Sequence, residues 1–350
     1  MTSHDFLKNR LFPYRFLLIQ TAFTGDVILA TPLIEKLRVT YPNAGIDLLL
    51  RKGTEGLFDG HPYIRELFIW DKMRFKYLQL FSIIKRIRRK EYDCCINLQR
   101  HCTTGIITLL SDSRETVGFT MNPFSRFFTR RFIHRIQPES GRTHEVDLYL
   151  QLLGGFVTDT GRIPPRLYPS ISDRTPLTVS APYITIAPAS IRFTRQYPAD
   201  KWIDVINRIP KTITVFLIGG AADTAKCQHI QSAATHPNVK NLAGHLSFLQ
   251  SAALMKGARM NFTNDSSPLH IASAVDAPVT ALFCSTVPRF GYGPLGSNAM
   301  VIETGESLPC RPCGPHGHRH CPKGHFRCSN IEASKLVERV FHPEPKTSGS

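Results

Sequence analysis

The sequence has no long uninterrupted apolar run. Apolar residues make up 42% of its 350 residues, yet no stretch approaches the roughly 18 to 20 uncharged apolar residues that a membrane-spanning helix needs. Residues 1–14 carry charge and lack the apolar segment and the small-residue cleavage site of a secretory signal. We therefore expect a cytoplasmic protein without a transmembrane helix.

Acidic residues are scarce relative to basic ones. The chain holds 43 Lys and Arg against 27 Asp and Glu, which gives a formal net charge of +16. The excess is concentrated in residues 72–90, which include eight basic residues and no acid, and in Arg126, Arg130, Arg131 and Arg135. Such a surface attracts nucleic acid, an anionic membrane or a phosphorylated substrate, although a basic run is often only a solvated face.

Short apolar segments alternate with amphipathic ones along the chain. This alternation is typical of βαβ units and a parallel sheet, and the length exceeds what one hydrophobic core usually organises. The predicted fold class is α/β, with two Rossmann-like doubly wound domains that face each other across a cleft. Strands are expected at residues 14–20, 46–50, 64–69, 92–98, 183–187, 212–218, 260–263 and 279–283, with a short one near 239.

The stretch 154–182 is rich in Gly, Pro, Ser and Thr and has no clear period, so we expect it to connect the two domains. The first domain is assigned to residues 1–175 and the second to 176–342, and the polar tail 343–350 is expected to be disordered. Open α/β sheets bind ligands at the carboxyl ends of their strands. The candidate motifs all lie at such ends.

Thr24-Gly25-Asp26 follows the first predicted strand and opens a helix. The glycine allows a tight turn, and the helix presents its amino terminus to the cleft. Asp26 is therefore placed to act as a general base on an acceptor hydroxyl. Equally, an acidic residue here can cap the helix and interact with its dipole.

Residues 264–270, Asn-Asp-Ser-Ser-Pro-Leu-His, also follow a strand and open a helix. Backbone N–H groups, the hydroxyls of Ser266 and Ser267, and His270 together suit a diphosphate at the helix amino terminus. The alternative is that Asp265 and the serines cap the helix while His270 packs against the sheet.

Two further loops contribute polar groups. Ser190 and Arg195 follow the strand at 183–187, and Arg195 is placed to stabilise a diphosphate leaving group, unless it is an ordinary surface arginine. Gly219 and Gly220 follow the strand at 212–218, and Asp223 beyond them is suited to accept hydrogen bonds from a ribose.

Taken together, these motifs resemble a known family. The chain is similar over roughly residues 14–340 to the family 9 glycosyltransferases, the ADP-heptose:lipopolysaccharide heptosyltransferases. The resemblance is carried by Thr24-Gly25-Asp26-Val27 with a following Thr-Pro-Leu, by Arg195-Gln-Tyr-Pro198, by Gly219-Gly220, and by Asn264-Asp265-Ser-Ser-Pro-Leu-His270 with the later Ala-Pro-Val-Thr-Ala-Leu-Phe283.

The resemblance implies a GT-B fold and an inverting transfer of heptose from ADP-heptose to the inner core of lipopolysaccharide, on an acceptor of the Kdo-lipid A type. The N-terminal domain would bind the acceptor and the C-terminal domain the nucleotide sugar. The enzyme would lie on the cytoplasmic face of the inner membrane as a peripheral protein, held through its basic residues. No nucleic-acid partner is implied.

The resemblance also implies roles for single residues. Asp26 matches the general base, Arg195 the catalytic cation and Ser190 a donor-phosphate hydroxyl, while Asp223 falls where the family usually has a ribose-binding acid, commonly Glu. Arg195 stands where family members often carry Lys, and Ser266-Ser267 replaces a more usual Thr/Ser-Gly. The remaining donor-binding residues would be Thr24, Gly25, Gly219, Gly220, Asp265, Ser266, Ser267 and His270.

The sequence shows no Asp-x-Asp pair at a strand end that would hold a divalent ion on a diphosphate, so we expect catalysis without a metal or other cofactor. A structural metal is a separate question. Cys310, Cys313, Cys321 and Cys328 lie among several histidines in residues 310–328, and in a cytosolic chain this set suits either a structural zinc site or reduced thiols. The other five cysteines, expected to be buried thiols, are Cys94, Cys95, Cys102, Cys227 and Cys284.

Two rival functions remain open from the sequence. A transferase or an epimerase of the same architecture could use another nucleotide sugar. A basic nucleic-acid-binding protein with a zinc loop is the rival from a different class, although no recognised groove-binding module accompanies the charge.

Overall fold

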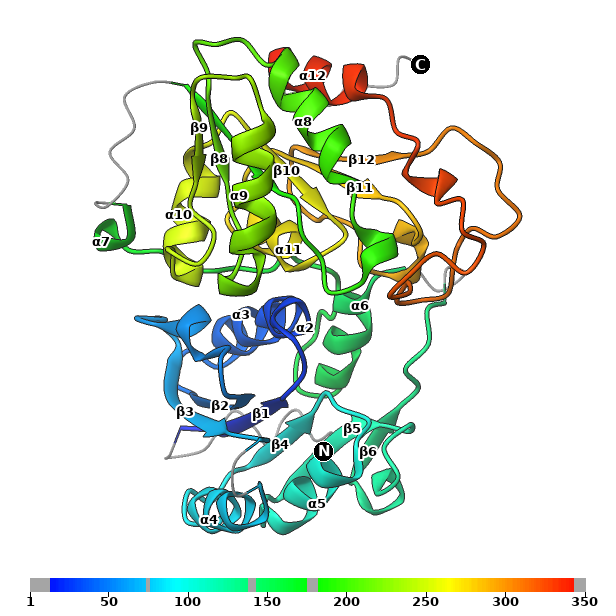
Figure 1. The fold of residues 1–350 in the computed structure, drawn as a ribbon. Coiled ribbons are helices and arrows are strands. Elements are labelled where there is room, and N and C mark those ends of the chain that lie inside the picture. Colours follow the sequence, from blue (N-terminus) through cyan, green and yellow to red (C-terminus); the bar gives the residue numbers. More distant parts are fainter. Residues whose placement is uncertain (1–12, 74–75, 138–142, 175–181, 343–350) are drawn as a thin grey trace. The chain divides into compact units, whose positions relative to one another are not determined.

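The computed structural model describes residues 13–73, 76–137, 143–174 and 182–342. The chain divides into two compact units, Met1–Arg166 and Leu167–Ser350. Each unit is built on a six-stranded sheet (Figure 1). The division thus follows Arg166, whereas the sequence placed it at residue 175, and the tail 343–350 lies outside the described residues.

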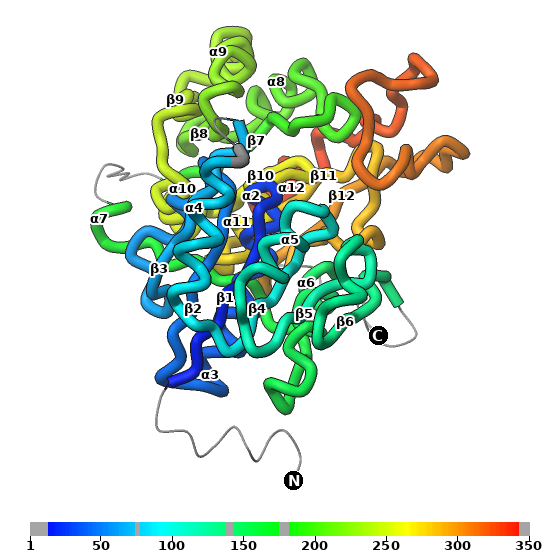
Figure 2. The backbone as a smooth tube through the Cα atoms, turned by 90° about the horizontal axis from the view of Figure 1, so that it is seen from below, coloured from blue at the N-terminus to red at the C-terminus, as the bar shows by residue number. Residues whose placement is uncertain are grey.

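The sheet of the first unit has the strand order β3-β2-β1-β4-β5-β6 (Figure 2). Every neighbouring pair in it is parallel. Apolar side chains of α4 pack against β1, β2 and β3 on one face, while α2, α3 and α6 lie on the other (Figure 1). The elements are β1 (Arg15–Gln20), α2 (Thr24–Leu29), α3 (Thr31–Thr40), β2 (Gly45–Arg51), β3 (Ile64–Trp70), α4 (Lys76–Arg88), β4 (Cys94–Asn97), α5 (Cys102–Leu110), β5 (Glu115–Phe119), β6 (Arg130–Phe132) and α6 (Glu145–Leu150).

The sheet of the second unit has the order β12-β11-β10-β7-β8-β9, again all parallel. Helices α8, α9 and α12 cover one face, and the neighbouring helices α10 and α11 also pack together. The elements are α7 (Ile171–Arg174), β7 (Tyr183–Ala187), α8 (Ala199–Arg208), β8 (Thr214–Leu217), α9 (Thr224–Ala233), β9 (Val239–Asn241), α10 (Phe248–Gly257), β10 (Met260–Asn264), α11 (Ser267–Ala274), β11 (Val279–Phe283), β12 (Ala299–Glu303) and α12 (Ala333–Phe341).

Both strand orders are doubly wound, so the direction of strand progression reverses between β1 and β4 and again between β7 and β10. Folds of this kind bind ligands at the carboxyl ends of the strands beside such a switch point. The prediction of two Rossmann-like α/β domains is therefore confirmed, and the predicted site motifs follow β1, β7, β8 and β10.

The helix after β1 is divided. Pro32 lies in the first turn of α3, where its missing N–H costs no hydrogen bond, and the short α2 precedes it. Within the described part of the chain, no helix is long and apolar enough to cross a bilayer.

Candidate functional site

Asn264 ties together the ends of β7 and β10. Its side-chain oxygen accepts a hydrogen bond from the backbone N–H of Tyr197 at 2.8 Å, and its amide nitrogen donates to the carbonyl of Ala187 at 3.4 Å. The side chain is fully buried. Asn264 therefore fixes the loop after β7, which carries Ser190 and Arg195, against the loop before α11.

Arg195 and Asp265 form an ion pair at this switch point. The Nη2 atom of Arg195, in the 3₁₀ turn Phe193–Arg195, lies 2.5 Å from Oδ1 of Asp265, and the hydroxyl of Thr286 donates to the other carboxylate oxygen at 2.6 Å. Among the described residues, the buried Nε of Arg195 meets no hydrogen-bond acceptor. Buried donors of this kind are usually satisfied, so the position suits an oxygen atom of a ligand.

Ser190 faces the same loop. Its hydroxyl donates to the backbone carbonyl of Asp265 at 3.4 Å, and its own carbonyl accepts a hydrogen bond of 2.5 Å from the side chain of Gln196. Lys226, on α9, contacts the other end of that Gln196 side chain. Burial lowers the pKa of Lys226, partly offset by Asp223. No pattern in the sequence indicated Lys226, because its position depends on how α9 packs beside the β7 loop.

The α11 motif is arranged around the helix amino terminus. Ser266 occupies the N-cap position in extended backbone, but its hydroxyl donates to the carbonyl of Asn264 at 3.4 Å and does not cap the helix. Ser267 begins α11 and is half-buried. His270 is only 4% exposed, and its ring lies 6.5 Å from that of Tyr292. The expected hydroxyls and histidine are thus gathered at one helix end.

Asp223 completes the turn that follows β8. Its Oδ2 accepts a hydrogen bond of 2.9 Å from the backbone N–H of Gly220. A Cβ atom on Gly219 would lie 2.8 Å from the Cβ atom of Asp223, so only glycine fits there. At least one carboxylate oxygen of Asp223 is therefore hydrogen-bonded within the turn. A contact between Asp223 and a ribose stays a prediction.

In the first unit, Thr24, Gly25 and Asp26 form the first turn of α2. The N-cap position belongs to Phe23, so Asp26 is not the capping residue that the alternative interpretation required. Asp26 is half-buried, and a carboxylate in the first turn interacts favourably with the helix dipole.

A buried amide network lies under α2 and was not predicted from the sequence. Gln20, the last residue of β1, donates to the backbone carbonyl of Asp26 at 3.4 Å and to the hydroxyl of Tyr149 at 3.2 Å. Gln99, which follows β4, contacts the side-chain oxygen of Gln20. These side chains hold the β1 and β4 ends in register and fix the start of α2.

Cationic groups gather at the same edge. The ammonium group of Lys72 donates to the carbonyl of Thr21 at 2.7 Å and to its hydroxyl at 3.1 Å. Burial, together with Lys72 and Arg100, lowers the pKa of His101. The positive charge in this part of the first unit therefore comes from Lys72 and Arg100, on the loops after β3 and β4, and Lys72 contacts the segment that leads from β1 to Asp26.

The four clustered cysteines are free thiols, as are the other five. The Sγ of Cys310 lies 3.7 Å from Nε2 of His325, and burial, with Cys310 and Cys321 nearby, raises the pKa of Cys313. Within the described ranges no three His, Cys, Asp or Glu side chains are placed to hold a metal ion together. Zinc at Cys310, Cys313, Cys321 and Cys328 therefore stays a prediction.

One cysteine prediction was wrong. Cys102 is exposed, because it is the first residue of α5 and the buried face of that helix is formed by later residues. Cys94, Cys95, Cys227 and Cys284 are buried as expected.

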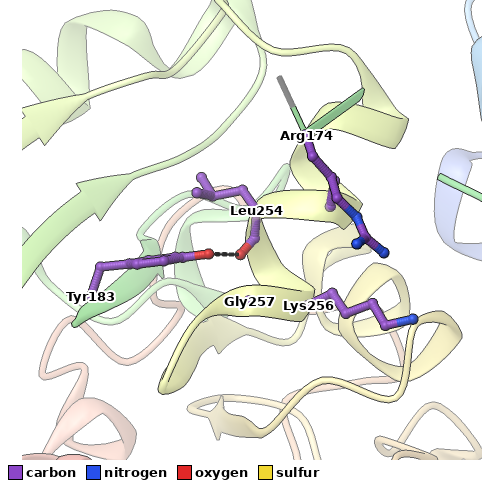
Figure 3. Close-up of a pocket in the computed structure, with 6 residues that line it drawn as sticks. Arg174, Tyr183, Leu254, Lys256 and Gly257 are labelled. Atoms are coloured by element: carbon purple, nitrogen blue, oxygen red, sulfur yellow. Dashed lines mark hydrogen bonds between the residues drawn. The ribbon is translucent and has the colours of Figure 1, made fainter. Parts of the chain in front are cut away.

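A pocket of about 310 Å³ lies elsewhere in the second unit. Its lining includes Tyr183, the first residue of β7, whose hydroxyl donates to the carbonyl of Leu254 at 2.9 Å (Figure 3). Arg174 and Lys256 also line it. Because β7 begins here, the pocket is at the amino edge of the sheet, opposite the motifs that follow the strands.

Comparison with known proteins decides the family. Residues 80–323 match the profile described as glycosyltransferase family 9 (heptosyltransferase). The chain belongs to glycosyltransferase family 9. This family member is therefore a glycosyltransferase, which confirms the predicted enzyme class and leaves the nucleic-acid-binding alternative without support.

Relatives of this glycosyltransferase agree with the assignment. Lipopolysaccharide heptosyltransferase 3 of Escherichia coli is 28% identical over 304 residues, which cover 83% of this chain and 89% of the relative. A family 9 glycosyl transferase from Veillonella parvula superposes with a TM-score of 0.79 at 22% identity, over 94% of this chain and 97% of that one. The E. coli ADP-heptose lps heptosyltransferase II superposes with a TM-score of 0.76 at 20% identity, over 94% of this chain and 98% of that one. These structures confirm the GT-B fold class.

Proposed function

We propose that this glycosyltransferase transfers heptose from ADP-heptose to an anionic, lipid-linked acceptor of the lipopolysaccharide inner core, of the Kdo-lipid A type. Family membership and the names of the relatives support heptose as the transferred sugar. The observation that carries the donor site is the Arg195–Asp265 pair beside the amino terminus of α11, at the switch point of the second sheet.

The donor diphosphate is proposed to bind at this switch point. The helix dipole of α11 and the guanidinium of Arg195 supply positive charge, while Ser190, Ser266 and Ser267 supply hydroxyls. The buried Nε of Arg195, which meets no acceptor among the described residues, would donate to a phosphoryl oxygen. His270 and Asp265 shape the same loop, and Gly219, Gly220 and Asp223 are proposed to approach the ribose.

The proposed reaction inverts the anomeric carbon. Asp26 takes the proton of an acceptor hydroxyl, and the hydroxyl oxygen forms a bond to the anomeric carbon of the heptose from the face opposite the diphosphate. The bond between that carbon and the phosphoryl oxygen breaks at the same time, and ADP leaves with the electron pair. Arg195 stabilises the charge that develops on the leaving oxygen. In this scheme a protein cation and a helix dipole take the place of a divalent metal.

The acceptor is proposed to be anionic because of the charges around Asp26. Lys72 and Arg100 lie at the carboxyl edge of the first sheet, on the loops after β3 and β4, and Lys72 contacts Thr21 just before α2, the helix that carries Asp26. Sugar-acid carboxylates and phosphates on the acceptor would be attracted to these groups. The first unit is therefore proposed to bind the acceptor and the second to bind the donor.

Helix α4 is proposed to contact the cytoplasmic face of the inner membrane. Leu78 and Phe81 are 73% and 72% exposed, and Lys85 and Arg88 follow them at helical spacing on the same face, both exposed. An apolar end beside exposed basic side chains is typical of helices that lie on anionic bilayers. This would place the acceptor-binding unit next to a lipid-linked substrate.

Turnover with ADP-heptose and a Kdo-containing lipid A acceptor, in the presence of a chelator, tests the proposal. We expect transfer by the native chain and a loss of kcat of about 10² or more in Asp26→Asn, the range for removal of a general base. Binding of ADP should be retained in this variant, because Asp26 does not contact the nucleotide in the proposed scheme. Product stereochemistry, read by NMR, reports inversion.

The other outcomes distinguish the alternatives. If the native chain binds ADP without transfer, the enzyme uses another sugar or acceptor, as a same-fold transferase or epimerase would. If ADP does not bind, the donor-site assignment is wrong. If transfer requires a divalent ion, the metal-independent scheme is wrong.

A further inference from the structure

The loop 313–326, here called the strap, crosses the segment that carries Arg195. The backbone N–H of Thr194 donates to the carbonyl of His318 at 3.1 Å, and the backbone N–H of His318 donates to the hydroxyl of Thr194 at 2.8 Å. Thr194 is 1% exposed and directly precedes Arg195. The hydroxyl of Thr194 also donates to the carbonyl of His318 at 3.4 Å, so three hydrogen bonds join the strap to the Arg195 segment.

Ser285 connects both segments to the end of β11. Its hydroxyl lies 3.0 Å from the hydroxyl of Thr194, and its backbone N–H donates to the carbonyl of Thr194 at 3.3 Å. Its own carbonyl accepts a hydrogen bond of 2.7 Å from the backbone N–H of Cys313. Because Ser285 is buried, these bonds are protected from competition with water.

Gly317 makes the closest approach to Arg195. A Cβ atom at this position would lie 2.9 Å from Oγ1 of Thr194 and 3.0 Å from Cγ of Arg195. Its φ of +67° is also a conformation that residues with a side chain rarely adopt. The strap thus runs against the aliphatic stem of Arg195, at a distance that only glycine allows.

Both ends of the strap are anchored. Arg311, next to its start, donates to the carbonyls of Cys284 at 2.6 Å and Thr286 at 2.9 Å, on either side of Ser285. At the other end, the ring of Phe326 lies 5.0 Å from that of Phe193, the residue before Thr194. The strap is therefore fixed to the same short segment that it covers.

We propose that the strap positions the guanidinium of Arg195 for the leaving diphosphate, with Thr194 and Gly317 as positioning residues. Asp265 holds the guanidinium from one side, and the strap restricts the stem from the other. This gives the Cys/His-rich loop a role in catalysis that acts through Arg195 and needs no contact with substrate. The inference rests on the proposed function, since it assumes that Arg195 acts on the leaving group.

A matched pair of substitutions at Thr194 tests the proposal. Thr194→Val keeps the shape but removes the hydroxyl that accepts from His318, whereas Thr194→Ser keeps that hydroxyl. We expect Thr194→Val to lower kcat by about ten- to a hundredfold, the scale of a small misplacement of a catalytic group, with a smaller change in the KM for the donor. Thr194→Ser should restore most of the native kcat.

Glycine substitutions give a second pair. Gly317→Ala should lower kcat to a similar extent, and Gly305→Ala serves as the control, because a Cβ atom at Gly305 meets no atom within 4 Å. Thermal unfolding of each variant separates loss of activity from loss of folded protein. If Gly317→Ala does not fold, the Thr194 pair still decides the question.

Three results would overturn the proposal. The first is a native kcat in folded Thr194→Val and Gly317→Ala. The second is an equal loss in Thr194→Ser and Thr194→Val. The third is an undiminished effect of Thr194→Val when Arg195 is already replaced by Met, since the strap is proposed to act only through Arg195. Failure of the proposed function is a separate result, namely no transfer by the native chain.

Discussion

Asp265 holds Arg195 at 2.5 Å between Oδ1 and Nη2, in a loop where the carboxylate itself is almost completely buried. The sequence predicted both residues as parts of a donor site but gave no reason for them to touch. The contact makes Arg195 a structural residue as well as a proposed catalytic one. Without Arg195, the buried carboxylate of Asp265 would keep the hydroxyl of Thr286 as its one side-chain hydrogen-bond donor among the described residues.

Arg195→Met is therefore expected to lower the free energy of unfolding by about 3 kcal/mol, the scale for breaking a buried ion pair by removing one partner. Urea unfolding of the two proteins measures this difference. The control is Arg208→Met, which removes the exposed pair that Arg208 makes with Asp204 on α8 and should cost no more than about 0.5 kcal/mol. Equal losses in the two variants would contradict the buried-pair argument.

His61 should make stability depend on pH. Burial lowers the pKa of His61 to about 4 from an ordinary value of 6.5, while the ring packs against Phe58 and its Nδ1 accepts a hydrogen bond of 3.2 Å from the backbone N–H of Tyr63. Between pH 6.5 and 4 the unfolded chain binds a proton that the folded chain does not. The stabilisation from neutral His61 is thus present above pH 6.5 and is lost as the pH falls through this window.

The loss of this stabilisation should lower the free energy of unfolding by about 2 kcal/mol between pH 7 and pH 5. Urea unfolding of the native chain and of His61→Gln at both pH values isolates this contribution, since other titrating groups affect the two proteins alike. The free energy of unfolding should fall less steeply with acid in the variant. Parallel curves for the two proteins would show that His61 is not the group responsible.

The proposed membrane contact of α4 makes its own prediction. Replacing Leu78 and Phe81 by Ser should weaken binding to vesicles of phosphatidylcholine and phosphatidylglycerol by at least about tenfold, because two exposed apolar side chains no longer enter the bilayer surface. Lys85→Gln should weaken it by about fivefold, and only on the anionic vesicles. Cosedimentation measures both effects.

Val39→Ser is the matched control, because Val39 is 80% exposed on α3 and is not part of the proposed contact. An equal loss in this variant would mean that binding depends on general surface hydrophobicity. Tight binding to neutral vesicles that is insensitive to Lys85 would argue against the electrostatic part of the proposal.

Cys321 should be the most reactive of the four clustered thiols. Burial alone would raise the pKa of Cys321, but hydrogen bonds from backbone N–H groups, including that of Phe326, outweigh it and lower the pKa. Burial raises the pKa of Cys328 to about 11. Since the thiolate is the reactive form, iodoacetamide at neutral pH should alkylate Cys321 well before Cys328, as mass spectrometry of the chelator-treated protein would show.

The same experiment without chelator examines the zinc prediction. A structural metal site would be established if all four thiols are protected from alkylation, and if a chelator removes this protection and releases zinc. Labelling of Cys321 without chelator would instead establish reduced thiols. Alkylation of Cys328 ahead of Cys321 would contradict the effect assigned to the backbone N–H groups.

The sequence was a good guide to the elements that bury one continuous apolar segment. The strands at 183–187 and 279–283 were predicted at the residues where β7 and β11 lie. Three strands, β5, β6 and β12, and two helices, α5 and α7, were not predicted. Gly118 interrupts β5, β6 has only three residues, two of them arginine, and β12 is an edge strand. Of the two missed helices, α5 has an exposed first residue, Cys102, and α7 has only four residues, none of them buried.

The sequence by itself determined which polar residues follow strands, and hence that Asp26, Arg195 and Asp265 lie at the carboxyl edges of their sheets. This information is local, because a strand and the loop after it are set by neighbouring residues. Only the tertiary structure decided that Lys226 reaches Gln196 and that His318 bonds Thr194, 124 residues away along the chain. Such contacts depend on how distant loops pack over one sheet, and no pattern within either loop records the partner that the packing supplies.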